Sequence, residues 1–410
     1  MMATRRDKLG RVLRKGECYK RSNNLYVYAY TDSLGKRRYI YSKDLMSLRD
    51  KEDQIQKDKL DRLGVYCIGK ADINYVFDRY LSTKNNLRGP TRANYIYNYD
   101  RYVRPDFGKK HISDVRYSDI VLYYNSLMNQ GLGISTVDNV HSLLHPAFEM
   151  AVRDNVIRNN PTNGALAEIK KSRNNSEKRH ALTYEEERAF LDYLDDDKNR
   201  RWKPLFTFML GTGVRVSEVM GLRWCDLDFD QREISINHRI VYYQKNEKDH
   251  KCGYDVLDGA KTEAGIRMIP MLDLVYEALL EEKNNQKKYG YHSIVEVGGM
   301  KGFVFCNRNG GIHNGSTLNR KIKNIVDDYN AEEEIKAKRE HREPILLPRF
   351  SCHIMRHTFC TRLCENETNI KVIQSVMGHK DIQTTLDIYA EVSEKKKIDV
   401  FKSLNQSNVL

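Results

Sequence analysis

Five side chains in the second half of the chain are of the types that can attack a phosphodiester. Arg215 follows a Gly-Thr-Gly turn, His353 and Arg356 stand three residues apart, His379 follows a glycine, and Tyr389 comes ten residues after it. An arginine fork holds two phosphate oxygens and keeps its charge at physiological pH. A phenol has a pKa of about 10 and becomes a good nucleophile only where cationic neighbours favour its anion. The set therefore predicts covalent phosphoryl transfer to a tyrosine, with no metal ion or nucleotide cofactor.

The spacing of these residues indicates the local elements that hold them. His353 and Arg356 are one helical turn apart, so a helix presents both on one face. Arg215 opens a predicted helix, whose first amides also face a bound anion. Glu218, one turn further on, either orients Arg215 or anchors the fold, and the sequence leaves both open. His357 is expected to point away from the pair and to serve packing or hydrogen bonding.

The order of these residues resembles the pattern of the tyrosine recombinase (integrase) family, which runs arginine, lysine, His-x-x-Arg, Gly-His and tyrosine. The resemblance covers roughly residues 180 to 405, and the first 60 or so residues make the integrases of conjugative transposons the nearest group. It implies a site-specific recombinase that integrates and excises a mobile element. Such an enzyme cuts DNA through a 3′-phosphotyrosine intermediate and rejoins strands through a Holliday junction.

The resemblance also implies a role for each residue of the site. Arg215 and Arg356 would clamp the scissile phosphate, and His353 would contact it or accept the tyrosine proton. His379 would hydrogen-bond the phosphate or assist proton transfer. Tyr389 would be the nucleophile.

A lysine completes the catalytic set by resemblance. The family carries a general acid for the leaving 5′ oxygen on a β-hairpin, and Lys261 stands at the matching position. Alternating residues on both sides of Glu263-Ala264-Gly265 predict that hairpin. Two departures from the family pattern are Met355, in place of a leucine, and Ala390-Glu391 after the tyrosine. Neither departure removes a functional group from the reaction.

The first 43 residues combine strong positive charge with strand-forming segments. They hold 12 basic and 3 acidic side chains, a net +9 within a chain whose net charge is +13. Residues 25–30 and 37–41 alternate like strands around a turn, a shorter strand precedes them near 17–21, and a polar helix follows to about Leu63. Such a charge suits a polyanion, and a small sheet with arginines on its rim can enter a DNA major groove. The alternative is a small cap domain whose tyrosines are all core.

The resemblance implies that this segment is an arm-type domain, which binds DNA sites distant from the crossover. We therefore expect DNA contacts from basic and aromatic side chains of the sheet and from a basic linker further on. The candidates are Arg5, Arg6, Arg14, Lys15, Lys20, Arg21, Tyr26, Tyr28, Arg37, Arg38, Tyr39, Lys170, Lys171 and Arg173.

The next hundred residues show the periodicity of a helical bundle. Helices are predicted from a Thr91 cap, over Ser113–Asn129 and from Ser135. Pro146 lies inside the apolar stripe of the last helix and is expected to kink or break it. The resemblance implies a core-binding domain here, which closes over the DNA.

The fold expected from these segments is multidomain and mainly α, with small β-sheets. An arm-type domain of a three-stranded sheet plus a helix takes residues 1–70, a helical core-binding domain takes 71–170, and a basic linker takes 171–182. A capping box formed by Thr183 and Glu186 opens an α+β catalytic domain over 183–410. The linker's charge suits a segment that follows a phosphate backbone.

The C-terminal tail has an apolar stripe that needs a groove. Ile398, Phe401 and Leu404 are spaced three apart among lysines, close to one face of a short helix. The groove belongs either to the same catalytic domain or, as the resemblance implies, to a neighbouring protomer. The second choice predicts a homo-tetramer on DNA, in which docking of the tail couples cutting to assembly.

The bulk composition excludes several classes of protein. The eight cysteines form no C-x-x-C pair and no zinc-like spacing with histidine, and scattered single cysteines fit a reducing compartment. No stretch of about 18 apolar residues is present, and residues 1–20 lack an apolar signal region. We expect a cytoplasmic, nucleoid-associated protein that binds double-stranded DNA at crossover and arm sites, without a membrane partner or a cofactor.

Other interpretations share part of this evidence. A type IB topoisomerase uses the same chemistry but pairs no sites, and the basic N-terminal sheet disfavours it. A phage integrase or a chromosome-dimer resolvase differs in biology, and the extra N-terminal domain disfavours the resolvase. A DNA-binding regulator that has lost catalysis would not need all six residues of the site. The resemblance also allows an excisionase-type accessory protein as a partner.

Overall fold

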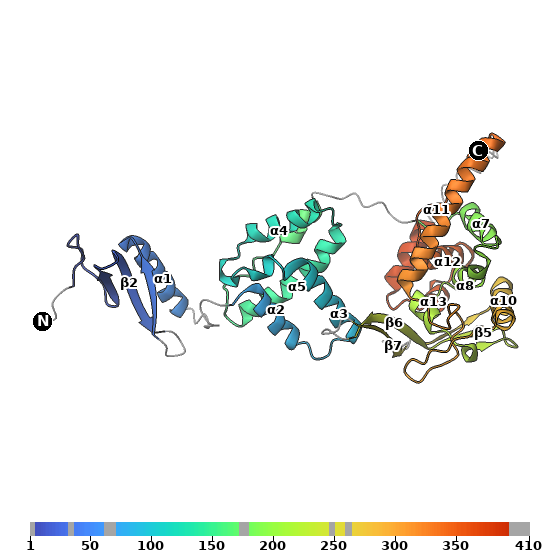
Figure 1. Ribbon diagram of the computed structural model, residues 1–410, viewed down its shortest axis with the longest axis horizontal. Helices are drawn as coiled ribbons and strands as arrows, with labels where there is room; N and C mark the ends of the chain where they lie inside the picture. Colours follow the sequence, from blue (N-terminus) through green and yellow to red (C-terminus); the bar gives the residue numbers. More distant parts are fainter. Residues whose placement is uncertain are drawn as a thin grey trace. The chain divides into compact units, whose positions relative to one another are not determined.

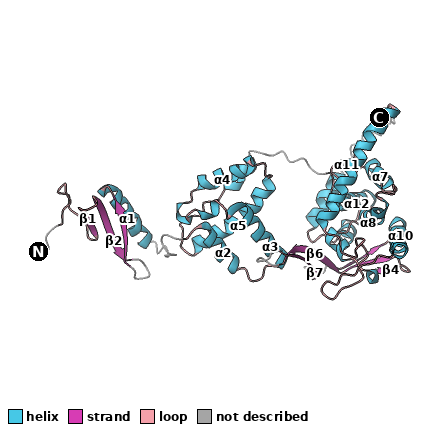
Figure 2. Ribbon diagram, viewed as in Figure 1, coloured by secondary structure: helices cyan, strands magenta, loops and turns pink. Residues whose placement is uncertain are grey.

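The structure of the chain is a computed structural model, which describes residues 5–31, 37–60, 71–171, 180–245, 251–258 and 265–392 (Figure 1). The chain forms two compact units, Met1–Ser176 and Glu177–Leu410. The described residues are mainly helical with small β-sheets, which confirms the predicted fold class (Figure 2). None of the helices in this described part is both long and apolar enough to cross a membrane.

The first unit begins with a three-stranded antiparallel sheet, followed by one helix. The strands are β1 (Glu17–Lys20), β2 (Leu25–Thr31) and β3 (Arg37–Ser42), with β2 in the centre, and the helix is α1 (Leu45–Leu60). Side chains of a strand alternate between the two faces of its sheet. One face packs on α1, through tyrosines of β2 and leucines of α1 that are almost fully buried. The predicted order of strands and helix is therefore confirmed.

The rest of the first unit is a helical bundle around its own apolar core. Its helices are α2 (Ile73–Ser82), α3 (Gly89–Asn98), α4 (Tyr117–Asn129), α5 (Ile134–Arg153) and α6 (Ala165–Lys171), with a π-helical turn at Tyr99–Val103 and single turns at Phe107–Lys109 and Ile112–Asp114. The rings of Phe77 and Tyr99 stack in this core, with their centroids 3.5 Å apart. Val140, Leu144 and Phe148 of α5 are buried in the same core, as their spacing predicts.

Two details of this bundle differ from the prediction. Helix α3 begins at Gly89 instead of at a Thr91 cap, because Pro90 occupies its first turn, where a missing N–H and a fixed φ are favourable. Helix α5 runs through Pro146 without a break. Proline removes one helical hydrogen bond, but buried residues on both sides of it hold the two halves of α5 in one core. Burial of the apolar stripe outweighs the lost bond.

The second unit combines a cluster of helices with two small sheets. Its helices are α7 (Tyr184–Tyr193), α8 (Lys203–Thr212), α9 (Val216–Gly221), α10 (Asp273–Tyr289), α11 (Gly315–Glu340), α12 (Cys352–Asn366), α13 (Ile370–Met377) and a helix over 382–392, with single turns at Arg200–Trp202 and Trp224–Asp226. Its strands are β4 (Leu227–Asp228), β5 (Glu233–Ile236), β6 (His238–Gln244), β7 (Cys252–Asp258) and β8 (Arg267–Pro270). One sheet has the order β4-β5-β8, and β6 pairs with β7 in the other.

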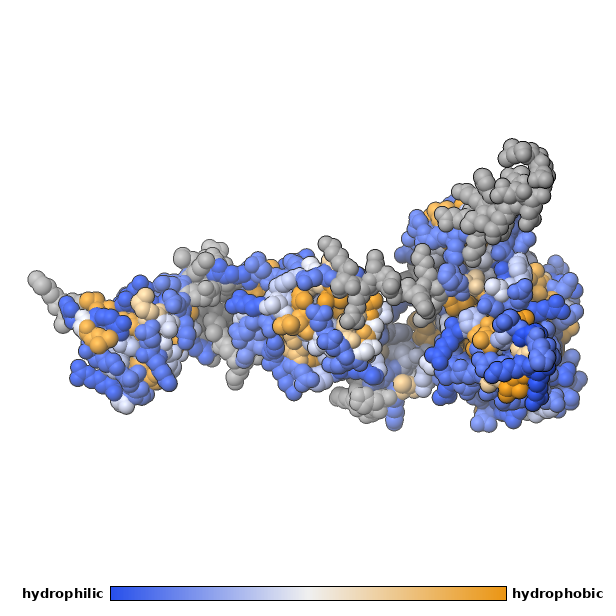
Figure 3. All heavy atoms as spheres, turned by 90° about the horizontal axis from the view of Figure 1, so that it is seen from above, coloured by the Kyte–Doolittle hydropathy of each residue, from blue (hydrophilic) through white to orange (hydrophobic). Residues whose placement is uncertain are grey.

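Helix α8 is the buried centre of the second unit. All of its residues from Pro204 to Thr212 are buried, and α10 and α12 both pack against it. A helix that is apolar on every side belongs inside a core, so this one sets the position of the loop that follows it. Hydrophilic side chains cover most of the face of this unit that is seen in Figure 3.

Helix α7 begins at the predicted capping box. The Glu186 N–H donates to Thr183 Oγ1 at 3.1 Å, and the Thr183 N–H donates to the Glu186 carboxylate at 2.8 Å. Two backbone donors that the helix itself cannot satisfy are thus paired.

The strands on either side of the predicted lysine turn do not pair with each other. β7 pairs with β6, and β8 pairs with β5 in the other sheet. Alternation identifies a half-buried strand but not its partner, and here each strand pairs with one that precedes it in the chain. The residues before Glu263 that the prediction takes as the first strand of the hairpin fall within 259–264, so the hairpin stays a prediction. The turn itself, 259–264, lies outside the described residues.

Candidate active site and DNA-contact surfaces

The turn after α8 sets the position of Arg215. Helix α8 ends at Gly213 with a left-handed backbone, φ 61°. A Cβ atom on Gly213 would meet the Phe359 ring at 2.4 Å, so both the backbone and the space require glycine. Arg215 then takes an extended conformation as the N-cap of α9, and its N–H donates to the Glu218 carboxylate at 2.9 Å. The predicted helix start at Arg215 is confirmed.

Three arginine side chains converge on the C-terminal end of α13, which Gly378 closes with a left-handed backbone, φ 62°. Each donates to a different carbonyl: Arg267 Nε to Val376 at 2.8 Å, Arg356 Nη2 to Met377 at 2.5 Å, and Arg215 Nη2 to Gly378 at 2.7 Å. The last carbonyls of a helix have no partner within it and carry partial negative charge. The guanidinium groups satisfy these carbonyls and are themselves held in place.

Glu218 is the buried counter-charge of this cluster. Its carboxylate accepts from Arg215 Nη1 at 2.8 Å and from Arg267 Nη2 at 2.9 Å. Burial raises its pKa, but hydrogen bonds and charges from Arg267 and Arg215 outweigh burial and lower the pKa to about 2. Glu218 therefore orients Arg215 and also anchors it to β8, so both roles that the sequence left open hold. Removing one partner of a buried ion pair typically costs about 3–5 kcal/mol.

Helix α12 presents four side chains, Cys360 among them, to a cavity of about 230 Å³. His353, Arg356 and His357 line it, together with His379. The shared face of His353 and Arg356 is as predicted. The expectation that His357 points elsewhere is wrong, because it stands four residues after His353 and so falls on the same helical face.

Arg356 is the most enclosed cation of the cavity. It is 4% exposed, and its Nη1 donates to the Gly213 carbonyl at 2.7 Å. It thereby ties the turn before Arg215 to the end of α13. Burial and the nearby Arg215 charge lower the pKa of Arg356 to about 9, so the guanidinium remains charged at neutral pH.

His379 follows directly from the end of α13 and is almost buried. Its Nδ1 lies 2.9 Å from Thr385 Oγ1, and its backbone carbonyl accepts from Gln374 Nε2 at 3.1 Å. Burial, followed by the charges of Arg356 and Arg215, lowers the pKa of His379 to about 4. The imidazole is therefore neutral at pH 7, where one ring nitrogen donates and the other accepts.

Tyr389 lies on the helix over 382–392, in different surroundings from the cationic groups. Its ring is half-buried against an apolar cluster that includes Cys360, Ile373 and Met377. Residues that precede Tyr389 on the same helix line the cavity, among them Asp387. The nucleophile predicted from sequence is thus packed beside the cavity and does not line it.

The structure brings four of the six predicted catalytic residues together. Arg215 and Arg356 meet at the end of α13, and His353 and His379 share the cavity with Arg356. Tyr389 stands on the adjoining helix, and Lys261 lies outside the described residues. The catalytic roles of all six remain predictions.

Arg267 is the member of this cluster that the sequence prediction missed. It is 7% exposed and faces the same side of β8 as the buried Ile269. The available signal was strand alternation, because an arginine at an inward position must find a buried partner. That partner, Glu218, is 49 residues away in sequence, so no local pattern pointed to the pair.

The N-terminal sheet has one covered face and one open face. Tyr26 and Tyr28 are 2% and 6% exposed and pack on α1, so their prediction as DNA contacts is wrong: side chains in the core cannot reach DNA. The strand register puts Lys20, Arg37 and Tyr39 on the opposite face. Tyr39 is 52% exposed, and the Arg37 guanidinium carbon lies 6.0 Å from the centre of its ring. The open face thus combines cations with an aromatic ring.

Comparison with known proteins decides the family. The model of the phage integrase family matches residues 180–396, more than half of the chain. The chain belongs to the phage integrase family. It is accordingly a tyrosine recombinase. Two further models match this integrase: the DNA binding domain of Tn916 integrase over residues 1–59, and the phage integrase N-terminal SAM-like domain over residues 73–128.

The integrase is similar to transposon enzymes along almost its whole length. It is 29% identical to a transposase from transposon Tn916 of Enterococcus faecalis, over 99% of this chain and 98% of the relative. A XerC-like tyrosine recombinase of Caldanaerobacter subterraneus is 28% identical over 76% of this chain and 75% of the relative.

Solved structures resemble the integrase as well. The Tn1549 transposon integrase in complex with a circular intermediate DNA has a TM-score of 0.67 and 27% identity, and the match covers 80% of this chain and 99% of that one. A lambda integrase tetramer bound to a Holliday junction has a TM-score of 0.51 at 16% identity, over 90% of this chain and 93% of that one. The second likeness is one of fold alone.

The remaining basic candidates of the integrase differ in their surroundings. Those engaged locally are Arg6, which donates to the Gly10 carbonyl, Arg14, which pairs with Asp53, and Lys170, which pairs with Asp138. Arg38 is half-buried on the α1 side of the sheet, whereas Arg5, Lys15 and Arg21 are exposed. The side chain of Lys171 and all of Arg173 lie outside the described residues.

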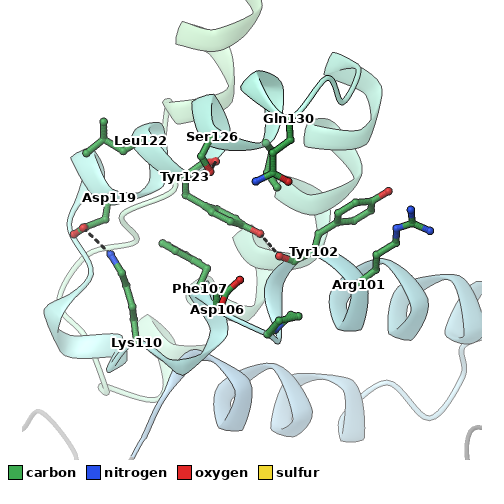
Figure 4. A pocket seen from close by; sticks show the side chains of 12 residues that line it. Arg101, Tyr102, Asp106, Phe107, Lys110, Asp119, Leu122, Tyr123, Ser126 and Gln130 are labelled. Atoms are coloured by element: carbon green, nitrogen blue, oxygen red, sulfur yellow. Dashed lines mark hydrogen bonds and ion pairs between the residues drawn. The ribbon is translucent and has the colours of Figure 1, made fainter.

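The helical bundle of the integrase contains a separate cavity of about 480 Å³ (Figure 4). The stacked rings of Phe107 and Tyr123 form one wall, and the Tyr123 hydroxyl donates to the Tyr102 carbonyl at 2.7 Å. Lys110 pairs with Asp119 at 3.0 Å, so its charge is balanced within the lining. The concentrated positive charge that phosphate chemistry needs is found around α13 instead.

Proposed function

We propose that this integrase is a site-specific recombinase that integrates and excises a mobile genetic element. It cleaves DNA through a 3′-phosphotyrosine intermediate and rejoins the strands through a Holliday junction. The observation that carries the proposal is the fixed pair of guanidinium groups, Arg215 and Arg356, held on successive carbonyls beside His379. Similarity to the Tn916 transposase over 99% of the chain supports a transposon as the element.

The reaction needs no external cofactor in this proposal. The Tyr389 oxygen attacks phosphorus in line, a bond from phosphorus to that oxygen forms, and the bond to the 5′ oxygen breaks. The phenol proton passes to His353 or to water, and the 5′ oxygen takes a proton from Lys261. Arg215 and Arg356 hold the non-bridging oxygens, where negative charge develops. The reverse attack by a 5′ hydroxyl of another strand rejoins the DNA.

The two clamp arginines are prepared for a phosphate. A guanidinium has five N–H donors. Among the described residues, the Arg215 side chain donates one hydrogen bond to Glu218 and one to Gly378. The Arg356 side chain donates one to Gly213 and one to Met377. Further donors on each side chain can therefore meet phosphate oxygens. Because both side chains are already held, binding requires little additional ordering, which favours the transition state.

A trapping experiment tests this function. The integrase is incubated in EDTA with a library of randomised duplexes. Each duplex carries a nick a few nucleotides from a possible cut, so that cleavage there releases a short fragment with a 5′ hydroxyl. Loss of this fragment prevents rejoining and traps the covalent species. A denaturing gel should show protein joined to DNA, and mass spectrometry should find the nucleotide on Tyr389. The absence of an adduct, attachment at another residue, or a strict need for a divalent metal would contradict the proposal.

A leaving-group substitution tests the general acid. Lys261→Ala should slow cleavage by roughly 10²–10⁴, the range for loss of a general acid. A 5′-phosphorothiolate at the cut has a sulfur leaving group that needs no proton, so it should restore the rate of Lys261→Ala. The same substrate should not rescue Arg215→Ala. Equal rescue of both variants, or of neither, would reject Lys261 as the acid.

Arm binding by residues 1–70 and clamping by 71–170 belong to the same proposal, with 171–182 as linker and 183–410 as the catalytic domain. The open face of the N-terminal sheet would enter a groove of arm DNA, with Lys20, Arg37 and Tyr39 in contact. The tail over 394–410 would dock on a neighbouring protomer of a homo-tetramer, and an excisionase-type protein would set direction. Because its substrate is chromosomal and element DNA, the enzyme would act in the cytoplasm, at the nucleoid.

The salt dependence of binding tests the arm surface. Arg37→Ala should make the fall of the association constant for arm DNA with salt less steep. The slope of its logarithm against the logarithm of salt concentration should shrink in magnitude by about 1, since one phosphate contact is lost. Lys51→Ala is the matched control, because Lys51 is an exposed cation on α1, which covers the opposite face of the sheet. An unchanged slope for Arg37→Ala, or an equal change for Lys51→Ala, would exclude the open face as the contact surface.

A further inference from the structure

One arginine of the cluster differs from the two clamp arginines: the Arg215 side chain is 35% exposed and Arg356 lines the cavity, whereas Arg267 is buried and does not line it. The side chain of Arg267 is 4% exposed, and its contacts are the Val376 carbonyl and the Glu218 carboxylate. A Cβ atom on Gly378 would lie 3.0 Å from Arg267 Nη1 and 3.2 Å from its Cζ, so the guanidinium lies against the bare glycine backbone. Arg267 thus stands beside the residues that would meet the phosphate, with its own guanidinium engaged by Glu218 and Val376 and packed against the Gly378 backbone.

The Glu218 carboxylate is divided between two cations. Its Oε1 accepts from Arg215 Nη1 at 2.8 Å and from Arg267 Nη1 at 3.3 Å. Its Oε2 accepts from Arg267 Nη2 at 2.9 Å and from the Arg215 backbone N–H, also at 2.9 Å. Arg267 therefore makes the bidentate contact that a lone arginine would make with a carboxylate, whereas the Arg215 guanidinium makes a single hydrogen bond to it.

From this division we infer that Arg267 is a positioning residue: it holds Glu218 so that the Arg215 guanidinium stays available to the scissile phosphate. The inference rests on the proposed function, because it concerns the same cleavage step. Two guanidiniums with one carboxylate leave a net positive charge, and Arg356 adds another. Arg267 also fixes the end of α13 through Val376, and with it the Gly378 carbonyl to which Arg215 donates.

Without Arg267, the Glu218 carboxylate should compete with the scissile phosphate for the Arg215 guanidinium. With Arg267 absent, the carboxylate has Arg215 as its remaining partner and can grip it with both oxygens. That pair is neutral, so less positive charge is left for the phosphate. Glutamine at position 218 still offers an oxygen to the Arg215 N–H but has no charge with which to hold the guanidinium.

The test is whether a second substitution restores the cleavage rate that the first one lowers. Cleavage of a nicked duplex is measured in a single turnover at saturating DNA, and DNA affinity is measured separately. Arg267→Met should slow cleavage on the order of 10²-fold while affinity changes less than about threefold, since the clamp acts mainly in the transition state. Adding Glu218→Gln to Arg267→Met should recover about tenfold, because Arg215 is released.

Controls separate positioning from folding. Arg223→Met removes a comparable part-buried ion pair with Asp226, in which the arginine donates at 2.8 Å, and should leave the rate per folded molecule unchanged. Thermal unfolding gives the folded fraction of each variant. If Arg267→Met does not fold, Arg267→Lys takes its place: it keeps the charge but lacks the fork, and should slow cleavage about tenfold.

Each outcome decides the inference. A wild-type rate per folded molecule in the Arg267 variant, or no gain from Glu218→Gln, would overturn the positioning role. If the unmodified integrase forms a covalent adduct and the Arg267 variant forms it as fast, the positioning role alone fails. If the unmodified integrase forms no adduct, the proposed function fails first and takes this inference with it.

Discussion

Replacing Tyr389 by phenylalanine should abolish the covalent protein–DNA species. The substitution removes one oxygen atom and leaves the ring, which packs against Cys360, Ile373 and Met377, so the fold should be unaffected. DNA affinity should stay within about twofold, because the clamp arginines and the N-terminal sheet are untouched. A denaturing gel of the nicked-duplex reaction measures the adduct, and a mobility-shift titration measures affinity.

Tyr289→Phe is the matched control, since it makes the same chemical change on an exposed tyrosine of α10 in the same unit. This control should form the adduct at the rate of the unmodified integrase. An adduct that persists in Tyr389→Phe would assign the nucleophile to another residue. Loss of the adduct in both variants would show that the phenylalanine change disturbs folding.

Removing either clamp arginine should have the next largest effect. Arg215→Ala and Arg356→Ala should each lose about 2.7–4 kcal/mol of transition-state stabilisation, or 10²–10³ in rate, the scale for one fixed charge-stabilising donor. The measurement is the single-turnover cleavage rate at saturating DNA. Affinity should fall much less than the rate, because charge on the phosphate oxygens grows as the reaction proceeds.

The two arginine variants should differ in stability. Arg356 is 4% exposed and bridges the Gly213 and Met377 carbonyls, so Arg356→Ala leaves both acceptors unsatisfied and should lower the unfolding temperature. The Arg215 side chain is 35% exposed and should affect stability less. Rates are therefore compared per folded molecule. A loss of rate that vanishes after this correction would show that the arginines serve the fold and not the phosphate.

Features that depend on near neighbours in the chain could be predicted from the sequence. His353 and Arg356 share a helical face because three residues make almost one turn, and Thr183 caps α7 because Glu186 stands at the right spacing. The three N-terminal strands follow from alternation and turn residues. The six predicted site residues were grouped by their order along the chain, which carries the family pattern.

Features that depend on distant neighbours were decided by the tertiary structure. Alternation places Tyr26 and Tyr39 on opposite faces of the sheet, but which face is covered depends on where α1 packs. In the same way, alternation marked the segment of β8 as a strand without naming β5 as its partner. Burial also set the outcome at Pro146, where the core on both sides of the proline keeps α5 whole.

The active site shows the same division most clearly. The sequence by itself determined that Arg215 begins a helix and that His379 follows a helix-ending glycine. Only the tertiary structure brought Arg215 to the Gly378 carbonyl, 163 residues away, and set Arg267 against the Glu218 carboxylate. Local spacing fixes backbone geometry over a turn or two, whereas a buried charge takes whichever partner the packing of α13 and β8 supplies. For that reason Arg267 became visible only in the fold.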